Sequence, residues 1–188
     1  MSNLDHEVRM IKTEAVREFV KGALDMVPDY FWKVPASSTG KYHPKYSLGE
    51  GGLVRHTQCV VYIALELFNI DRYNYPQNIK DCIIAALILH DTFKHGAVDE
   101  LGRYDQYSVT EHPLIASDFV RSLENSEGAE YRFFIADLIK THMGQWTQDY
   151  RTKKEILPHP TTAMQDFVHL CDYLASRKEL TYERARYE

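Results

Sequence analysis

Residues 82–94 read CIIAALILHDTFK, an apolar run that ends in His90, Asp91 and Lys94. Because the run is apolar on every side, a helix formed by it must be buried. We therefore predict a buried helix over residues 78–94 that carries an imidazole and a carboxylate into the interior. A buried charge is costly unless it is paired or binds a metal ion, so the same stretch indicates both the core and a site.

The segments around this stretch also repeat apolar residues at helical spacing. Further helices are expected over residues 5–26, 53–69, 113–123, 129–143 and 161–178. No segment alternates polar and apolar residues over a useful length, so no strand is predicted. Residues 28–52, rich in Pro, Gly, Ser and Tyr, are expected to form an irregular loop with a functional role. The predicted fold class is all-α, a single-domain helical bundle.

The composition is that of one mildly acidic globular domain. The chain has 188 residues, 44% of them hydrophobic and 26% charged, and a formal net charge of −5. This length suits one domain, predicted to span residues 1–188. Proteins that track long nucleic acids usually carry a basic face, so we expect a small substrate and no long nucleic-acid partner. The sequence leaves the oligomeric state open.

The cysteines and the N-terminal segment bear on the compartment. Cys59, Cys82 and Cys171 lie in apolar segments without a CxxC pair, and scattered thiols of odd number are typical of a reducing compartment. The segment MSNLDHEVRM has no apolar signal-peptide core, and the longest apolar run, residues 82–89, is too short to span a bilayer. We expect a cytoplasmic protein with no membrane partner.

Polar residues fall on the apolar faces of five of the expected helices. Any one such histidine is more often a core residue bonded to a backbone carbonyl. A shared metal site explains the whole set better, because coordination satisfies all these groups at once. The predicted metal ligands are His56, His90, Asp91, His112, His142 and Asp172.

The remaining histidines are not predicted to bind metal. His6, His95, His159 and His169 lie in polar or loop contexts, and we expect them on the surface. His43 precedes the first histidine motif, and its place stays open between the site and the surface.

The order of these residues resembles the HD-domain superfamily of metal-dependent phosphohydrolases, in its branch with two extra histidines. GGLVRHT (51–57) resembles the segment around that family's first histidine, and LILHDTFK (87–94) resembles its HDxxK helix. THMG (141–144) and CDYLASR (171–177) resemble its later histidine and final aspartate motifs. The resemblance covers residues 51–178, which would form the motif-bearing core of a single HD domain.

The resemblance implies two divalent metal ions. His56, the His90–Asp91 pair and Asp172 would hold one ion, and Asp91, His112 and His142 the other, so that Asp91 bridges them. A ligand set rich in histidine and poor in carboxylate favours Mn, Fe, Co, Ni or Zn over Mg. Two such ions can activate a hydroxide for phosphoester hydrolysis, with Asp91 and Lys94 as catalytic residues.

Four residues are candidates for binding a phosphorylated substrate, a nucleotide or short oligonucleotide. The loop ASSTGKYHP (36–44) could cradle a phosphate through its N–H groups and Lys41, with His43 as substrate ligand or general acid; an ordinary surface loop is the alternative. Lys94 either stabilises phosphoryl charge or is an exposed lysine at a helix end. Trp146 could stack on a base, or belong to the core or its rim.

Two other functions remain open for these motifs. Some HD-fold proteins use the same ligand set to hold a mixed-valent di-iron centre that activates O₂, and such a protein would be coloured, iron-rich and EPR-active. A non-catalytic, metal-stabilised nucleotide-binding protein would instead bind its ligand tightly without turnover.

Overall fold

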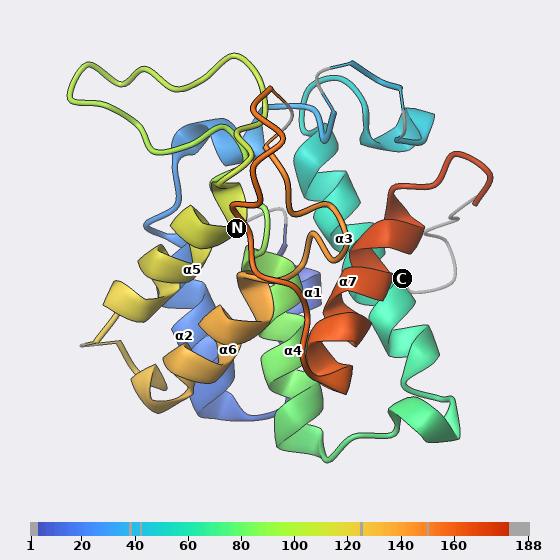
Figure 1. The fold of residues 1–188 in the computed structure, drawn as a ribbon. Helices are drawn as coiled ribbons and strands as arrows, with labels where there is room; N and C mark the ends of the chain where they lie inside the picture. The colour runs from blue at the N-terminus through green and yellow to red at the C-terminus, as the bar shows by residue number, and fades with distance from the viewer. Residues whose placement is uncertain (1–3, 38, 42, 125, 150, 181–188) are drawn as a thin grey trace.

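The buried helix predicted from residues 82–89 is the centre of the molecule. In the computed structural model, α4 (Gln77–Leu89) runs through the middle of the bundle, and all of residues 82–89 are buried (Figure 1). Helices α1, α2, α3, α6 and α7 all pack against it. The structure describes residues 4–37, 39–41, 43–124, 126–149 and 151–180.

Across these described residues the chain forms seven α-helices and no strand, which confirms the all-α, single-domain prediction. Besides α4, the helices are α1 (Asp5–Arg9), α2 (Glu14–Leu24), α3 (Gly52–Leu67), α5 (His112–Ser122), α6 (Arg132–Ile139) and α7 (Ala163–Ala175). Short 3₁₀ turns are η1 (Asp29–Trp32), η2 (Lys45–Ser47), η3 (Asp71–Tyr73) and η4 (Ala129–Tyr131). Helix α5 packs on α6, and α3 packs on α7.

The prediction of one N-terminal helix over residues 5–26 is wrong, because the chain breaks between α1 and α2. Asp81 of α4 lies at the break, and its carboxylate accepts hydrogen bonds from the backbone N–H of Lys12 and Thr13 at 3.1 and 2.7 Å. The Thr13 hydroxyl donates to the same carboxylate at 2.7 Å. Lys12 and Thr13 lie just before Glu14, the first residue of α2. Asp81 therefore fixes the non-helical link between α1 and α2 against α4.

The long segment before α3 is irregular, as predicted, but it is firmly tied to α3. The Arg55 guanidinium donates to the backbone carbonyls of Tyr46, Leu48 and Glu50 at 2.5, 2.8 and 2.9 Å. One side chain of α3 therefore holds the end of the loop that carries His43.

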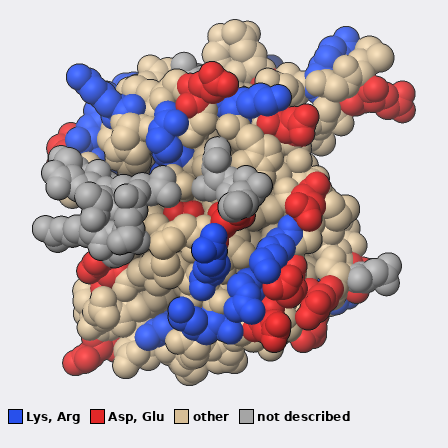
Figure 2. All heavy atoms as spheres, turned by 180° about the vertical axis from the view of Figure 1, so that it is seen from behind, with Lys and Arg blue, Asp and Glu red and all other residues tan. Residues whose placement is uncertain are grey.

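On the face opposite to the view of Figure 1, Lys and Arg form a band across the lower centre of the described surface, bordered by Asp and Glu (Figure 2). No helix in the described part of the chain is long and apolar enough to cross a membrane.

Candidate metal centre

Five helix ends bring the six predicted metal ligands together. His56 lies near the start of α3 and His112 opens α5, whereas Asp172 lies in the last turn of α7. His90 and Asp91 follow α4 directly, and His142 follows α6. Figure 1 shows these helix ends on the side of the bundle covered by the long loops.

Two helices end earlier than their sequence pattern predicts, and this positions three of the ligands. Helix α4 ends at Leu89 rather than at residue 94, and α6 ends at Ile139 rather than at residue 143. His90, Asp91 and His142 therefore lie in turns beyond the helix ends. They are still buried, because each is at most 1% exposed.

Three of the histidines are held by the same backbone contact. The Nδ1 atoms of His90, His112 and His142 lie 2.7, 2.7 and 2.8 Å from the carbonyl oxygens of Leu87, Val109 and Ile139, three residues earlier. A carbonyl only accepts, so Nδ1 carries a proton, and Nε2 is an acceptor whenever the ring is neutral. Metal-binding histidines are commonly oriented by such a contact.

Asp91 lies at the centre of the histidines, and its two oxygens face different pairs. Oδ1 lies 3.1 Å from His112 Nε2 and 3.6 Å from His142 Nε2. Oδ2 lies 3.4 Å from His90 Nε2 and 3.8 Å from His56 Nε2. Each carboxylate oxygen of Asp91 therefore faces a different pair of histidine nitrogens.

Asp172 completes the side of the cluster nearest α3. Its Oδ1 lies 2.9 Å from His56 Nε2 and 3.7 Å from His90 Nε2. The ligand atoms of two trios are close enough to hold an ion, namely His56, His90 and Asp172, and His90, Asp91 and His142. His112 adjoins the second trio through its contacts with Asp91 and His142.

The donor set fits a metal ion because it leaves buried acceptors facing one another. The Nε2 atoms of His112 and His142 are 3.1 Å apart, although both rings already donate through Nδ1. His90 Nε2 and Asp91 Oδ1 are buried and have no hydrogen-bond partner among the described residues. Unpaired polar atoms in the interior are costly, and a shared cation would satisfy these four at once.

The electrostatics of the cluster favour the metal-binding protonation states of Asp91, Asp172 and His142. Burial opposes ionisation of Asp91, but Lys94 and the surrounding histidines hold the pKa of Asp91 well below its usual value. His56 and His90 do the same to the pKa of Asp172, again against the effect of burial. Burial lowers the pKa of His142 to about 4. At neutral pH the carboxylates are therefore ionised and His142 is neutral, the forms that coordinate metals.

The pKa of His90 is raised, whereas burial lowers the pKa of His56 and of His142. Burial opposes protonation of His90, but the charge of Asp91 and the contacts with Asp91 and Asp172 raise its pKa to about 10. Without a metal ion, His90 is therefore protonated at neutral pH, and it must lose this proton before its Nε2 can coordinate a metal ion.

Lys94 faces the cluster rather than the solvent. Its side chain is 12% exposed, and its Nζ lies 2.5 Å from Asp91 Oδ2. This contact excludes the alternative of an exposed lysine at a helix end. The ammonium group instead adds positive charge beside the central carboxylate.

Of the other predicted substrate-binding residues, the structure brings His43 to the cluster. Its ring centroid lies 5.2 Å from that of His56, and its buried Nδ1 has no hydrogen-bond partner in the described structure. Burial, aided by His56 and Lys94, lowers the pKa of His43 to about 3. Lys41 is exposed on the same loop. The proposed phosphate cradle is described only in part, because Ser38 and Tyr42 lie outside the described residues.

Trp146 lies on the loop after α6, and its side chain is 43% exposed. Its ring stacks with that of Tyr173, the residue after Asp172. Tyr173 and His169 also lie beside the site, and neither was predicted from the sequence as its neighbour. Tyr173 follows Asp172 directly, and His169 precedes Asp172 by three residues on α7. Residues three apart on a helix share a face, so this spacing could have predicted that His169 lies near Asp172.

The prediction that four histidines lie on the surface is confirmed for His159 and wrong for His95, which is 4% exposed. His95 is drawn inward because its Nδ1 lies 2.7 Å from the carbonyl oxygen of Asp105 and its ring packs against Tyr30. His6 and His169 are half-buried. The sequence around a loop histidine does not show such contacts, because they are made with residues of other segments.

Comparison of the chain with protein-family models, with curated proteins and with solved structures gives no match. The resemblance to HD domains therefore rests on the sequence motifs alone.

Proposed function

We propose that this protein is a metal-dependent phosphohydrolase of the HD type that acts on a small phosphorylated substrate. The observation that carries the proposal is the position of Asp91 between two pairs of histidines, with one carboxylate oxygen toward each pair. Structural metal sites are usually closed four-ligand sets. A bridged double site with a cation at its edge is better suited to phosphoester chemistry.

The proposed ligands divide around Asp91. His56, His90 and Asp172 would hold one ion, and His112 and His142 the other, with Asp91 shared. The three rings that donate Nδ1 to backbone carbonyls are already turned so that Nε2 points inward. Such orientation reduces the reorganisation needed for binding. The imidazole-rich set favours Mn, Fe, Co, Ni or Zn.

When bound, two such ions supply Lewis acidity toward the phosphoester oxygens and a nucleophile from water at neutral pH. The chain's own residues would position the substrate. Lys94 would place a positive charge against the phosphoryl group, because its Nζ is held at the centre by Asp91. His43 would offer a hydrogen bond from the loop side, since its ring lies against that of His56.

The di-iron oxygenase shares these motifs, including the HDxxK lysine, so metal content and activity separate it from the hydrolase. The mostly buried ammonium group of Lys94 suits an anionic substrate for either reaction. The second pair of histidines disfavours the non-catalytic nucleotide-binding protein. A sensor needs one ion at most, and the second pair of histidines adds buried acceptors without stabilising the fold.

The test is a screen of metal-loaded protein. Protein reconstituted separately with Mn²⁺, Fe²⁺, Co²⁺, Ni²⁺ or Zn²⁺ is assayed against phosphomonoesters, phosphodiesters and nucleotides. We expect metal-dependent phosphate release that chelation abolishes, and that Asp118→Asn, a change of an exposed carboxylate on α5, leaves unchanged. Purified protein that is coloured, carries tightly bound iron with an EPR signal and releases no phosphate would support the oxygenase instead.

A further inference from the structure

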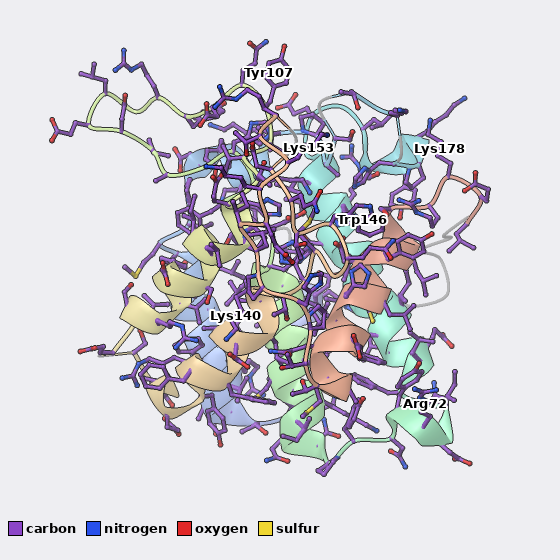
Figure 3. The ribbon with its side chains drawn as sticks, in the orientation of Figure 1. Arg72, Tyr107, Lys140, Trp146, Lys153 and Lys178 are labelled. Atoms are coloured by element: carbon purple, nitrogen blue, oxygen red, sulfur yellow. The ribbon has the colours of Figure 1, made fainter. Side chains whose placement is uncertain are left out.

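Three planar side chains form a stack beside the metal centre. The rings of Trp146 and Tyr173 are nearly parallel, with an interplanar angle of 18° and centroids 5.6 Å apart. The guanidinium carbon of Arg177 lies 4.4 Å from the Tyr173 centroid. Figure 3 shows Trp146 beside α7, among the loops that cover this end of the bundle. We name Trp146, Tyr173 and Arg177 the aromatic stack.

The aromatic stack is attached to the metal centre from two sides. Tyr173 directly follows Asp172, so their Cα atoms are about 3.8 Å apart. On the other side, His169 donates from Nδ1 to the backbone carbonyl of His142 at 2.8 Å, and its ring packs edge-on against Trp146. Both elements that carry the stack therefore also carry metal ligands.

A glycine allows the two elements to come this close. Gly144 lies between His142 and Trp146 and has a φ of +61°. A Cβ at this position would lie 2.4 Å from three atoms of the His169 ring. Only a residue without a side chain fits, so the turn that ends in Trp146 can lie directly against α7.

The exposure of the stack indicates a ligand rather than a core. Trp146 is 43% exposed, and Tyr173 and Arg177 are half-buried. Large aromatic residues are mostly covered in folded proteins. An aromatic ring that is fixed from behind and open to solvent is the kind of surface on which nucleobases stack, with added stabilisation from a nearby arginine.

We propose that the aromatic stack is a nucleobase platform, so that the substrate of the metal centre is a nucleotide whose base lies on Trp146. The position of the phosphate at the metal centre rests on the proposed phosphohydrolase function. The binding of the base rests only on the aromatic stack. Because every base has a π face, the platform accepts different bases without a strong preference.

A binding experiment tests the platform without any turnover. The chain has two tryptophans, so Trp32→Phe leaves Trp146 as the single reporter of fluorescence. Trp32 belongs to η1 and packs against Phe31 and the core, so phenylalanine retains a ring there. We expect adenosine and AMP to quench the Trp146 emission saturably, and ribose 5-phosphate to leave it unchanged. The matched Trp146→Phe protein, which reports from Trp32, should show no response to AMP.

A kinetic experiment measures the contribution of the base. Trp146→Ala should lower the ratio of kcat/KM for AMP to that for ribose 5-phosphate by about 5- to 150-fold, the range of one base stacked on an aromatic ring. Trp146→Phe should recover part of the ratio, because it restores a ring. Trp32→Phe, as the control, should keep the wild-type ratio.

The outcomes separate the platform from the hydrolase. Absence of quenching by adenosine and AMP, or an unchanged substrate ratio in a folded Trp146→Ala protein, would overturn the platform while phosphate release could still support the hydrolase. Saturable quenching in a protein that hydrolyses no phosphoester would support the platform and overturn the hydrolase. Should Trp146→Ala fail to fold, as judged by circular dichroism, the titration of Trp32→Phe decides the question.

Discussion

The Nε2 atoms of His112 and His142 lie 3.1 Å apart, and both rings donate their Nδ1 proton to a backbone carbonyl. Two buried acceptors at this distance repel each other unless a cation lies near both. The backbone contacts leave the rings little freedom to turn away, because each Nδ1 is fixed within its own turn. The relationship between these two residues is the feature on which the prediction of a second metal ion depends.

We predict two metal ions per chain. His142→Ala should lower the stoichiometry from two to one, because it removes an acceptor from one side of Asp91 and leaves the trio of His56, His90 and Asp172 intact. Elemental analysis of Mn- or Fe-loaded protein measures this. His159→Ala, which changes an exposed histidine, is the control. A stoichiometry of one metal ion per chain that His142→Ala does not alter would contradict the prediction of two ions.

We predict that removal of metal lowers the melting temperature. Ligand bound only by the native state stabilises it by about 2.7 kcal/mol at a concentration of 100 Kd, which for a domain of this size is roughly 5–10 °C. Differential scanning fluorimetry before and after chelation, with metal content checked by elemental analysis, measures the shift. Equal melting temperatures of the metal-loaded and the metal-free protein would mean that a cation at the buried acceptors does not stabilise the fold.

We predict that Asp91→Ala abolishes phosphohydrolysis and leaves the fold helical. The change removes the shared carboxylate from both sides of the centre, whereas residues 82–89 still pack in the core. Lys94→Ala should cost less, on the order of 10²- to 10³-fold in kcat, because it removes only charge stabilisation. Steady-state assays with circular dichroism as the folding check compare the two. A folded Asp91→Ala protein with wild-type turnover would refute the mechanism.

We predict that Asp81→Ala destabilises the fold without changing metal stoichiometry. The substitution leaves the N–H groups of Lys12 and Thr13 without their acceptor, at a cost of about 2–4 kcal/mol. Urea denaturation measures the free energy of unfolding, and elemental analysis measures the metal. Asp118→Ala, at an exposed site of α5, should lie within about 0.5 kcal/mol of wild type. Equal stability of the two variants would show that Asp81 does not stabilise the break between α1 and α2.

We predict that Gly144→Ala weakens both metal binding and the preference for AMP over ribose 5-phosphate. A Cβ there must displace the His169 ring, which contacts the His142 backbone and Trp146. Gly102→Ala is a matched control, because Gly102 also has a positive φ, of 75°, but a Cβ there meets nothing within 4 Å. Metal titration and the ratio of kcat/KM for AMP to that for ribose 5-phosphate are measured for both variants. Gly102→Ala shows the effect of backbone strain alone, and any further loss in Gly144→Ala is due to the clash with His169. If both variants behave alike, the contact with His169 has no role.

The sequence by itself determined the class of the fold and the direction of the candidate ligands. Helical periodicity is a local property, so it reveals which side of a segment is buried without knowledge of its neighbours. Residues 82–89 are apolar on every side and are all buried. The same pattern placed His56, His112 and His142 on inward faces, and the structure finds each of them at most 4% exposed.

Only the tertiary structure decided how distant residues meet. The break between α1 and α2 depends on Asp81, which lies 68 residues from Thr13 in the sequence, so no local pattern could show it. His95 was misplaced for the same reason, since the carbonyl that holds it belongs to a loop ten residues on. The division of the Asp91 oxygens between two pairs of histidines likewise requires four helices to pack at fixed distances. Periodicity specifies a face of one helix, whereas hydrogen bonds and coordination depend on distances of about 3 Å between elements, which packing alone sets.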